Sequence, residues 1–380
     1  MSFPTSPSDG QQYTASNGAV FQYDSSTDSW TKISTAVQIQ RPGKNKIQNG
    51  DMSIAQRGTS FTSVANGDYT LDRYLYQKVG VMTHTITQDS STPSDDFGYS
   101  LKLDCTAVDT SIATTDFCVI SQRIEGYNFR PLAGKNCTLS FWVKAGKTGT
   151  MCVAFQNSGN NRTYVVEVPI TAASTWQYKQ IPITFDDLGG TWDYTNGIGI
   201  KVLFCLVCGT AYHTTTPETW ITTNDFATFN QTNFVSNNDT TCDVWLTGIQ
   251  LEEGTQATDF EFRSFQEELK LCERYYEKSY EYGDPPGTTG SYPYPGALAS
   301  YSINNNNLAF QIQFKTRKRT APTATAYSPQ TGTSGKARYS GGSDVDVTNI
   351  NNGEANTHFY GAGGAASTQH YLHYVAEAKL

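Results

Sequence analysis

The chain has 380 residues, of which 16% are charged and 13% aromatic, and its formal net charge is −8. A chain of this length is expected to form two or three domains. Few charges with many Thr, Ser, Asn and Gly residues are typical of strands and polar turns rather than of helices. The negative net charge argues against a nucleic-acid partner.

The N-terminal unit, residues 1–40, is predicted to be a small β module. Asn17-Gly18 provides the positive φ angles of a tight hairpin turn, and a second turn is expected at residues 24–28. The strands carry four aromatic side chains: Tyr13, Phe21, Tyr23 and Trp30. Two or three short strands are too small to be stable alone. The unit is therefore expected to dock onto a larger assembly through these aromatics, with a floppy tail as the alternative.

Residues 41–263 show the period of two that indicates strands. Apolar residues alternate with polar ones at 99–105, 137–144 and 151–155, and Gly- and Asn-rich turns separate the runs. The run from Val202 to Cys208 is apolar on both faces, which predicts a central strand covered on both sides. The fold class predicted for this region is mainly β, a jelly-roll or β-sandwich.

One connecting helix is predicted over residues 264–281. Ser264 is a capping residue, and Glu267 completes a capping box. Phe265, Leu269, Cys272 and Tyr276 then fall on one narrow apolar stripe, and Pro285 prevents any continuation. The stripe is expected to pack either on the sandwich or on copies of the chain.

A C-terminal β domain is predicted over residues 282–380. Leu308, Phe310, Ile312 and Phe314 alternate, whereas residues 331–368 are predicted to be long surface loops. The basic run at 315–319 is expected to be a solvated strand end, or else a contact to phosphate or acidic glycan.

The eight cysteines do not indicate a disulfide framework. Most lie among apolar strand residues, where free Cys behaves as a small hydrophobic residue, and cytoplasmic assembly keeps thiols reduced. The N-terminus has no basic region and no apolar core, so it does not resemble a signal peptide. The longest apolar run is far shorter than the roughly 20 residues that span a bilayer, so no membrane insertion is expected.

A set of short motifs resembles those of bacteriophage tail-fibre and receptor-binding proteins. The set spans roughly residues 46–280 and consists of Asn49-Gly50-Asp51-Met52 through Phe61, Asp72-Arg73-Tyr74, Leu139 to Lys144, Leu246 to Glu261, and Glu268 to Tyr276. The first and fourth motifs resemble the first and last strands of the β-sandwich in those proteins. The resemblance implies a non-enzymatic virion component, a homotrimer assembled in the host cytoplasm. It would bind other tail or head proteins through its N-terminus and host cell-surface glycan through β domains.

The sandwich is also similar in architecture to carbohydrate-binding modules, some of which hold a structural calcium. Asp51 and Asp243 would be the carboxylate ligands here, because calcium prefers a cluster of oxygen ligands. Ordinary turn-capping aspartates are the alternative, and no other cofactor is expected.

Catalytic constellations are weak. The carboxylate pairs Asp95-Asp96, Asp186-Asp187 and Glu252-Glu253 are adjacent in sequence and are expected to diverge as solvated turn residues, whereas glycoside hydrolysis needs two carboxylates facing one cleft. The five histidines show no metal-binding spacing, and no serine-nucleophile motif occurs. No enzyme is therefore predicted.

Binding of a sugar is better supported, because sugar sites combine aromatic platforms with a few polar groups. Trp192, Tyr194, Tyr212 and Trp220 lie in loop-rich stretches and are the first candidates for a platform, with core or interface packing as the alternative. Phe359 and Tyr360, in the expected distal loops, are the second candidates for a platform.

Three functions follow in order: a tail fibre that attaches to host glycan, a structural virion protein without a receptor role, and a glycan-degrading tailspike.

Overall fold

The structure is a computed structural model that describes residues 3–14, 20–34, 43–186, 189–236, 242–302, 308–362 and 367–380. It divides into two units, Met1–Lys44 and Asn45–Leu380, which are taken in turn. The predicted boundary at residue 40 and the predicted Asn17-Gly18 turn lie outside the described residues.

The N-terminal unit is a three-stranded antiparallel sheet of β1 (Gln12–Thr14), β2 (Val20–Asp24) and β3 (Ser29–Ser34). Its aromatic side chains gather around Phe3, whose ring stacks on Trp30 at a centroid distance of 5.1 Å. Tyr13 and Phe21 pack edge-on against the same ring at 5.2 and 5.1 Å. The predicted aromatic set thus forms a miniature core, and its anchoring role stays a prediction.

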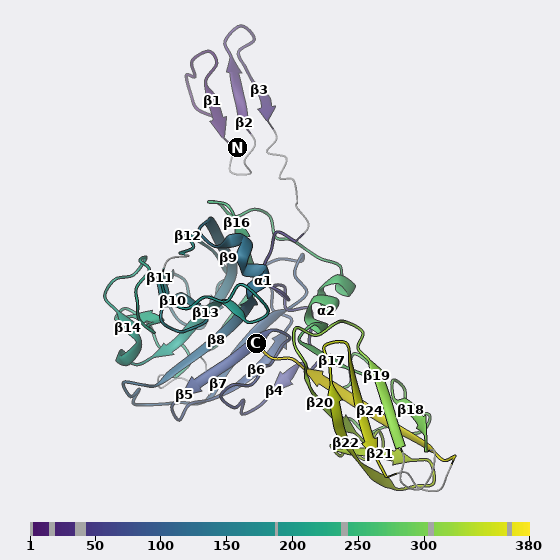
Figure 1. Cartoon of the computed structure of the whole chain (residues 1–380). Helices are drawn as coiled ribbons and strands as arrows, with labels where there is room; N and C mark the ends of the chain where they lie inside the picture. Colours follow the sequence, from purple (N-terminus) through teal and green to yellow (C-terminus); the bar gives the residue numbers. More distant parts are fainter. Residues whose placement is uncertain are drawn as a thin grey trace. The chain divides into compact units, whose positions relative to one another are not determined.

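The second unit begins with a sandwich of two antiparallel sheets (Figure 1). The five-stranded sheet has the order β11 (Thr163–Ile170), β10 (Gly149–Asn157), β13 (Ile198–Cys208), β8 (Phe117–Glu125), β5 (Tyr74–Val79). The six-stranded sheet has the order β12 (Gln177–Thr184), β9 (Asn136–Ala145), β16 (Val244–Glu253), β7 (Ser100–Ala107), β6 (Thr83–Asp89), β4 (Ser60–Phe61). Short elements connect them: α1 (Gly126–Phe129), η1 (Arg130–Leu132), η2 (Thr210–Tyr212), β14 (His213–Thr214) and β15 (Ala227–Thr228).

The core lies between the two sheets, as the period-two pattern predicts. Phe141 of β9 meets Phe204 of β13 edge-on at 5.1 Å, and both rings are fully buried. The prediction that residues 202–208 form a central strand covered on both faces is confirmed, because every residue from Gly199 to Cys208 in β13 is buried. The mainly-β sandwich class is therefore confirmed.

The predicted first strand at residues 49–61 is wrong, since only Ser60 and Phe61 are in a strand. Asn49 and Met52 have φ angles of 55° and 60°, which belong to turns rather than to strands. The Asn49 side chain accepts from the amide of Ile54 at 2.8 Å and donates to the carbonyl oxygen of Asp72 at 2.9 Å. The hydrogen bonds of this side chain stabilise a loop where a strand was predicted. The predicted last strand is present as β16.

The connecting helix is α2 (Phe265–Glu273), and its predicted capping box between Ser264 and Glu267 is confirmed. The helix stops eight residues before the predicted end at 281, because β17 (Tyr276–Lys278) pairs with the C-terminal strand. The predicted stripe is also interrupted: Cys272 is buried, but Phe265 is 45% exposed. The helix buries Glu268 and Glu273 instead, which form ion pairs with Arg263 and Lys315.

The rest of the unit forms a sheet centred on β24 (Gln369–Glu377), which pairs with four strands. The remaining strands are β18 (Leu298–Tyr301), β19 (Leu308–Gln313), β20 (Thr323–Tyr327), β21 (Lys336–Tyr339), β22 (Asp344–Asn352) and β23 (Asn356–Gly361). The alternation predicted for β19 is confirmed. The long loops predicted at 331–368 are wrong, since β21, β22 and β23 occupy most of that range. These strands bury only one face and contain few apolar residues, so the sequence pattern did not indicate them.

The basic run at 315–319 is a solvated strand end only in part, because Lys315 and Arg317 are exposed and Lys318 is not. Lys318 is fully buried and its Nζ lies 2.5 Å from Oε2 of Glu277, while Arg317 pairs with Glu354 at 2.8 Å. Arg319 donates from Nη1 to the carbonyl oxygen of Asn196 at 2.9 Å. These cations therefore hold structural contacts within the second unit.

All eight cysteines are buried free thiols, as predicted. Burial raises the pKa of Cys105 and of Cys152 to about 11, so both stay protonated at neutral pH. In the part of the chain that the structure describes, no helix has both the length and the apolar character needed to cross a membrane.

Candidate functional site

The outer face of the five-stranded sheet is only partly covered. The segment 209–236 crosses it, tied by the amide of Phe234 to the carbonyl oxygen of Leu206 at 2.8 Å and by a bridge between Ile221 and Thr163. Two residues of this segment, Phe226 and Ala227, pack on outward-facing residues of the sheet, including Val119 and Leu203. Beside this segment, an uncovered part of the sheet forms a groove over β5, β8, β10 and β13.

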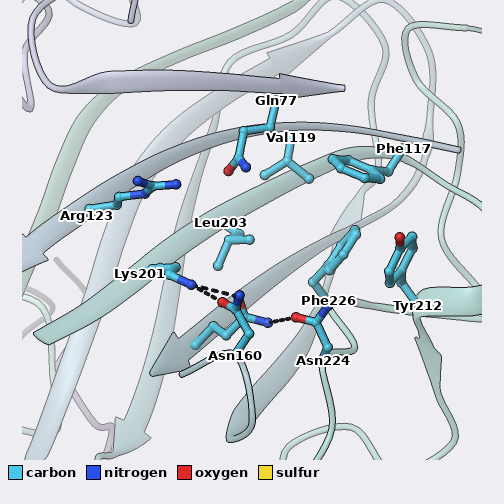
Figure 2. A pocket seen from close by; sticks show the side chains of 11 residues that line it. Gln77, Phe117, Val119, Arg123, Asn160, Lys201, Leu203, Tyr212, Asn224 and Phe226 are labelled. Carbon is cyan, nitrogen blue, oxygen red and sulfur yellow. Dashed lines mark hydrogen bonds between the residues drawn. The ribbon is translucent and has the colours of Figure 1, made fainter. Parts of the chain in front are cut away.

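This groove has a volume of about 180 Å³ and is the candidate functional site (Figure 2). Its lining residues come from four strands, from the turn after β10 and from the covering segment: Gln77, Phe117, Val119, Arg123, Gln156, Asn160, Lys201, Leu203, Tyr212, Asn224 and Phe226. The strand alternation explains the set, because residues two apart point to the same face. Ile200, Val202 and Phe204 enter the core, and Lys201 and Leu203 face the groove.

One end of the groove is aromatic. Tyr212 stacks on Phe226 at a centroid distance of 4.7 Å, and Phe117 packs edge-on against both rings at 5.5 and 5.4 Å. Phe226 is buried, and Tyr212 and Phe117 are half-buried, so each of the latter two rings keeps some exposed surface. Figure 2 shows the three rings together, away from the charged residues.

The other end is polar and is organised around Lys201. Its Nζ donates to Oε1 of Gln156 at 3.4 Å and to the side-chain oxygen of Asn160. Gln156 in turn donates from Nε2 to Oδ1 of Asn224 at 2.7 Å. Asn160 lies in the turn after β10 with a φ of 54°, a conformation that Asn tolerates better than most residues. The result is a continuous row of amide groups beside one ammonium group.

Two cations meet at this end, and no Asp or Glu side chain is among the lining residues. Lys201 on β13 lies directly opposite Arg123 on β8 in the strand register. Burial, with a smaller contribution from Arg123, lowers the pKa of Lys201 to about 8. Arg123 donates from Nη1 to the main-chain oxygen of Leu380, and its buried Nε has no partner within the described residues.

The arrangement suits recognition of a polar ligand with apolar faces. Amide and ammonium groups can hydrogen-bond to hydroxyl groups, and exposed aromatic faces can pack against the C–H face of a sugar ring. None of the eleven lining residues is Asp or Glu. Glycoside hydrolysis by the usual mechanism needs two carboxylates, so this groove is equipped for binding.

Of the four residues predicted as a platform, only Tyr212 lines the groove. Trp192 and Tyr194 stack on the buried ring of Phe129 at 5.5 and 6.2 Å, and Trp220 packs on Trp192 at 5.8 Å. Both indole N–H groups are engaged, Trp192 with the carbonyl oxygen of Gly189 and Trp220 with that of Thr184. The two tryptophans and Tyr194 are half-buried and pack against the sandwich core, while a glycan role for them stays a prediction.

The second predicted platform, in the C-terminal domain, needs a correction. Phe359 is 2% exposed and belongs to the core of that domain, because it alternates inward along β23. It therefore has no face to offer a sugar. Tyr360, its outward neighbour on the strand, is 37% exposed.

The two predicted calcium ligands have separate partners. Asp51 accepts from Oγ of Ser53 at 2.9 Å, and Asp243 forms an ion pair with Lys102 at 2.9 Å. Burial and a hydrogen bond with Asp104 raise the pKa of Asp243 to about 6. Within the described ranges, no group of three or more His, Cys, Asp or Glu side chains is placed to hold a metal ion. Calcium binding stays a prediction.

The acidic pairs meet the expectation of solvated turns only in part: Asp95 and Asp96 are exposed turn residues, as predicted, whereas Glu252 and Asp186 have structural partners. Glu252 is 2% exposed and accepts from Oγ1 of Thr258 at 2.6 Å, so it fixes the turn after β16. Asp186 forms an ion pair with Arg162. Asp187 lies outside the described residues.

Sequence reasoning missed the polar end of the groove. The available signal was Lys201 itself, a single charge inside the apolar strand Ile198–Cys208. A charge in such a strand must face solvent, a partner or a ligand. Arg123, Gln156 and Asn224 carried no comparable signal, because only the fold brings their distant positions together.

The sequence matches no protein-family model and no curated protein. Among solved structures, similarity is found to the enzymatically active domain of tailspike protein 4 from bacteriophage CBA120, at 12% identity and a TM-score of 0.29 over 51% of this chain and 21% of that one. A family 11 carbohydrate-binding module from Clostridium thermocellum, in complex with a mixed-linked tetrasaccharide, is similar at 11% identity and a TM-score of 0.28, over 53% of this chain and 99% of that one. A sugar-binding protein candidate from Bacteroides thetaiotaomicron gives 12% identity and a TM-score of 0.29 over 55% of this chain and 100% of that one. With TM-scores this low, these similarities are too weak to assign a function.

Proposed function

We propose that this chain is a glycan-binding attachment protein and that the groove on the outer face of the five-stranded sheet is its glycan site. One observation carries the proposal: an aromatic end and an amide-rich end share one open groove, with no carboxylate among the lining residues. Sugar rings present apolar faces and hydroxyl rims, so a site that holds them needs both kinds of surface.

The position of the groove also supports recognition. Its floor is formed by hydrogen-bonded strands, so the polar side chains on β8, β10 and β13 are held at fixed spacings. The covering segment adds Tyr212 and Asn224 from the side. A rigid floor with one wall lowers the conformational entropy lost when a flexible oligosaccharide binds.

The biological setting that we propose is a bacteriophage virion. The motifs between residues 46 and 280 that resemble tail-fibre proteins support a tail fibre, a homotrimer that attaches the particle to host cell-surface glycan. In this proposal the N-terminal sheet, with Tyr13, Phe21, Tyr23 and Trp30, binds other tail or head proteins. The chain acts without catalysis and is assembled in the host cytoplasm.

The test is a glycan array probed with the full chain and with three variants. Tyr212→Ala removes an aromatic face from the groove, and Asn224→Ala removes an exposed amide from its wall. Phe229→Ala is the matched control, because Phe229 lies in the same segment, is 62% exposed and does not line the groove. We expect glycan affinity to fall about fivefold in Tyr212→Ala, from loss of roughly 1 kcal/mol of aromatic packing, and to stay unchanged in Phe229→Ala.

Two results would overturn the proposal. The full chain could bind no glycan at all, which would leave a structural virion role. Alternatively, binding could survive both groove variants and be lost in Trp192→Ala, which would move the site to the tryptophan cluster. Labelled chain located in virion images, together with mass measurement of the purified oligomer, tests the tail-fibre setting and the trimer separately.

A further inference from the structure

The cross-strand pair of Lys201 and Arg123 is an unusual feature of the groove floor. Side chains directly opposite on neighbouring antiparallel strands lie about 4.5–5.5 Å apart at Cβ, and like charges in such pairs are destabilising. Lys201 is also 8% exposed, so solvent screens its charge weakly. The fold therefore maintains an unfavourable charge arrangement on the face that we assign to the ligand.

Nearby Asp and Glu side chains do not relieve this arrangement. The hydrogen bonds of Lys201 run to the amide oxygens of Gln156 and Asn160, which carry no charge. Glu125 follows Arg123 by two positions on the same face of β8, but it is already held by Arg274 at 2.6 and 2.8 Å and by Tyr275 at 2.7 Å. Arg123 uses Nη1 on a main-chain oxygen and leaves its buried Nε free among the described residues.

Three other cations of the second unit have a counter-charge. Lys318, Arg57 and Arg263 each have a carboxylate within ion-pair distance. Lys278, which is 2% exposed, donates from Nζ only to the main-chain oxygens of Tyr282 and Asp284, so neutral acceptors alone do not set Lys201 apart. Lys201 differs because a second cation, Arg123, lies directly opposite it in the strand register. An anion at the Lys201–Arg123 pair would supply the missing charge.

We propose that the groove selects acidic glycans, with an anionic group of the sugar, carboxylate or phosphate, bound at the Lys201–Arg123 pair. This inference rests on the proposed glycan-binding function and adds the class of sugar. Arginine presents several donors in a fixed fork and lysine acts as a point charge, a combination that suits an anion of either kind. The aromatic end, with Tyr212, then packs against a neutral sugar unit of the same chain.

The experiment compares matched acidic and neutral probes by calorimetry with the full chain. The carboxylate arm pairs sialyllactose with lactose, and a hyaluronan tetrasaccharide with its carboxyl-reduced form. The phosphate arm pairs mannose 6-phosphate with mannose. We expect at least one acidic probe to bind tenfold or more tightly than its neutral partner, with affinity that falls as salt rises. The arm that shows the preference identifies the anion.

Variants assign the preference to the pair. Lys201→Met should lose tenfold or more of the acidic affinity and little of the neutral affinity, whereas Lys201→Arg should keep most of the preference. Lys270→Met is the matched control, since Lys270 is an exposed residue of α2 and does not line the groove. Thermal melts of each variant verify folding.

The outcomes separate the two proposals. If acidic and neutral probes bind equally and Tyr212→Ala abolishes both, glycan binding stands and the acidic preference is wrong. If an acidic preference survives Lys201→Met, the anion site is elsewhere and this inference falls. If neither the array nor any of these probes shows binding, the proposed function itself fails.

Discussion

Two buried lysines show how the same residue serves different purposes in two regions of this molecule. Lys318, below the C-terminal sheet, is fully buried with Glu277, and their charged atoms lie 2.5 Å apart. Lys201, on the outer face of the sandwich, is 8% exposed and contacts only amide oxygens. Both lysines lose water, but only the first finds an anion within the chain.

The surroundings of Glu277 explain why the first lysine is structural. The carboxylate also accepts from the hydroxyl of Tyr374 at 2.6 Å and from the amides of Lys315 and Thr316 at 3.2 and 3.3 Å. Burial lowers the pKa of Lys318, and the charge of Glu277 opposes that shift. In this network the charges of Lys318 and Glu277 are paired with each other, so neither charge is left for a ligand. The comparison teaches that burial alone does not indicate a site, whereas a buried cation that faces a second cation in an open groove is a candidate for one.

The largest effect should come from breaking the closed network. Lys318→Met leaves Glu277 buried without its cation, and we expect the free energy of unfolding to fall by about 3–5 kcal/mol. Urea denaturation followed by tryptophan fluorescence measures the loss. The double variant Lys318→Met with Glu277→Gln removes both charges and should recover most of it. A single variant within 1 kcal/mol of the parent would contradict the structural assignment.

The difference between the two lysines also shows what the sequence could and could not predict. Local patterns predicted several elements, because these depend on neighbours within a few residues. Alternation predicted the strands of the sandwich, the run apolar on both faces predicted β13, and Ser264 with Glu267 predicted the capping box of α2. The partners of Lys318 and Lys201 depend on strands far apart in sequence. Lys318 pairs with a residue 41 positions away, and Lys201 lies beside an amide 45 positions away. The basic run at 315–319 therefore appeared solvated throughout, although the fold buries Lys318.

The same limit explains why the predicted platforms lie where the sequence did not indicate. Phe359 and the Trp192 cluster were chosen because aromatics in Gly- and Asn-rich stretches suggested loops. Phe359 instead lies in β23 and fills a core, and the indole of Trp192 stacks on Phe129. Tyr212 was chosen on the same reasoning and does line the groove. Composition identifies that an aromatic residue is near a turn, and only tertiary packing decides which face of its ring is free.

A second, smaller effect should appear in the pH dependence of stability. Burial lowers the folded-state pKa of Lys201 to about 8, below its ordinary value, so the unfolded chain binds more protons between pH 8 and about 10.5. The penalty for the buried charge is fully present below pH 8 and is lost as pH rises toward 10.5. We therefore expect the parent to gain on the order of 2 kcal/mol relative to Lys201→Met between pH 7 and pH 10.

The comparison with Lys201→Met is necessary because burial also lowers the pKa of Lys278 to about 8. That lysine titrates in both proteins, so its contribution cancels in the difference. Denaturant melts at a series of pH values supply the measurement. A stability difference that is flat across this range would mean that Lys201 is solvated in the folded protein, and the contrast with Lys318 would then be lost.

The smallest effect on stability, about 1 kcal/mol, should come from giving Lys201 the counter-charge that Lys318 already has. Gln156→Glu places a carboxylate where Oε1 of Gln156 now lies, 3.4 Å from Nζ of Lys201. The new ion pair should stabilise the fold and raise the pKa of Lys201, while loss of the hydrogen bond from Gln156 to Asn224 offsets part of the gain. Gln180→Glu, at an exposed position of β12, adds the same charge without the lysine.

If an unpaired charge defines the site, Gln156→Glu should also lose tenfold or more of its affinity for acidic glycan, and Gln180→Glu should keep it. A variant that is stabilised and still binds the acidic probe as tightly as the parent would show that the groove does not use Lys201 as an anion receptor.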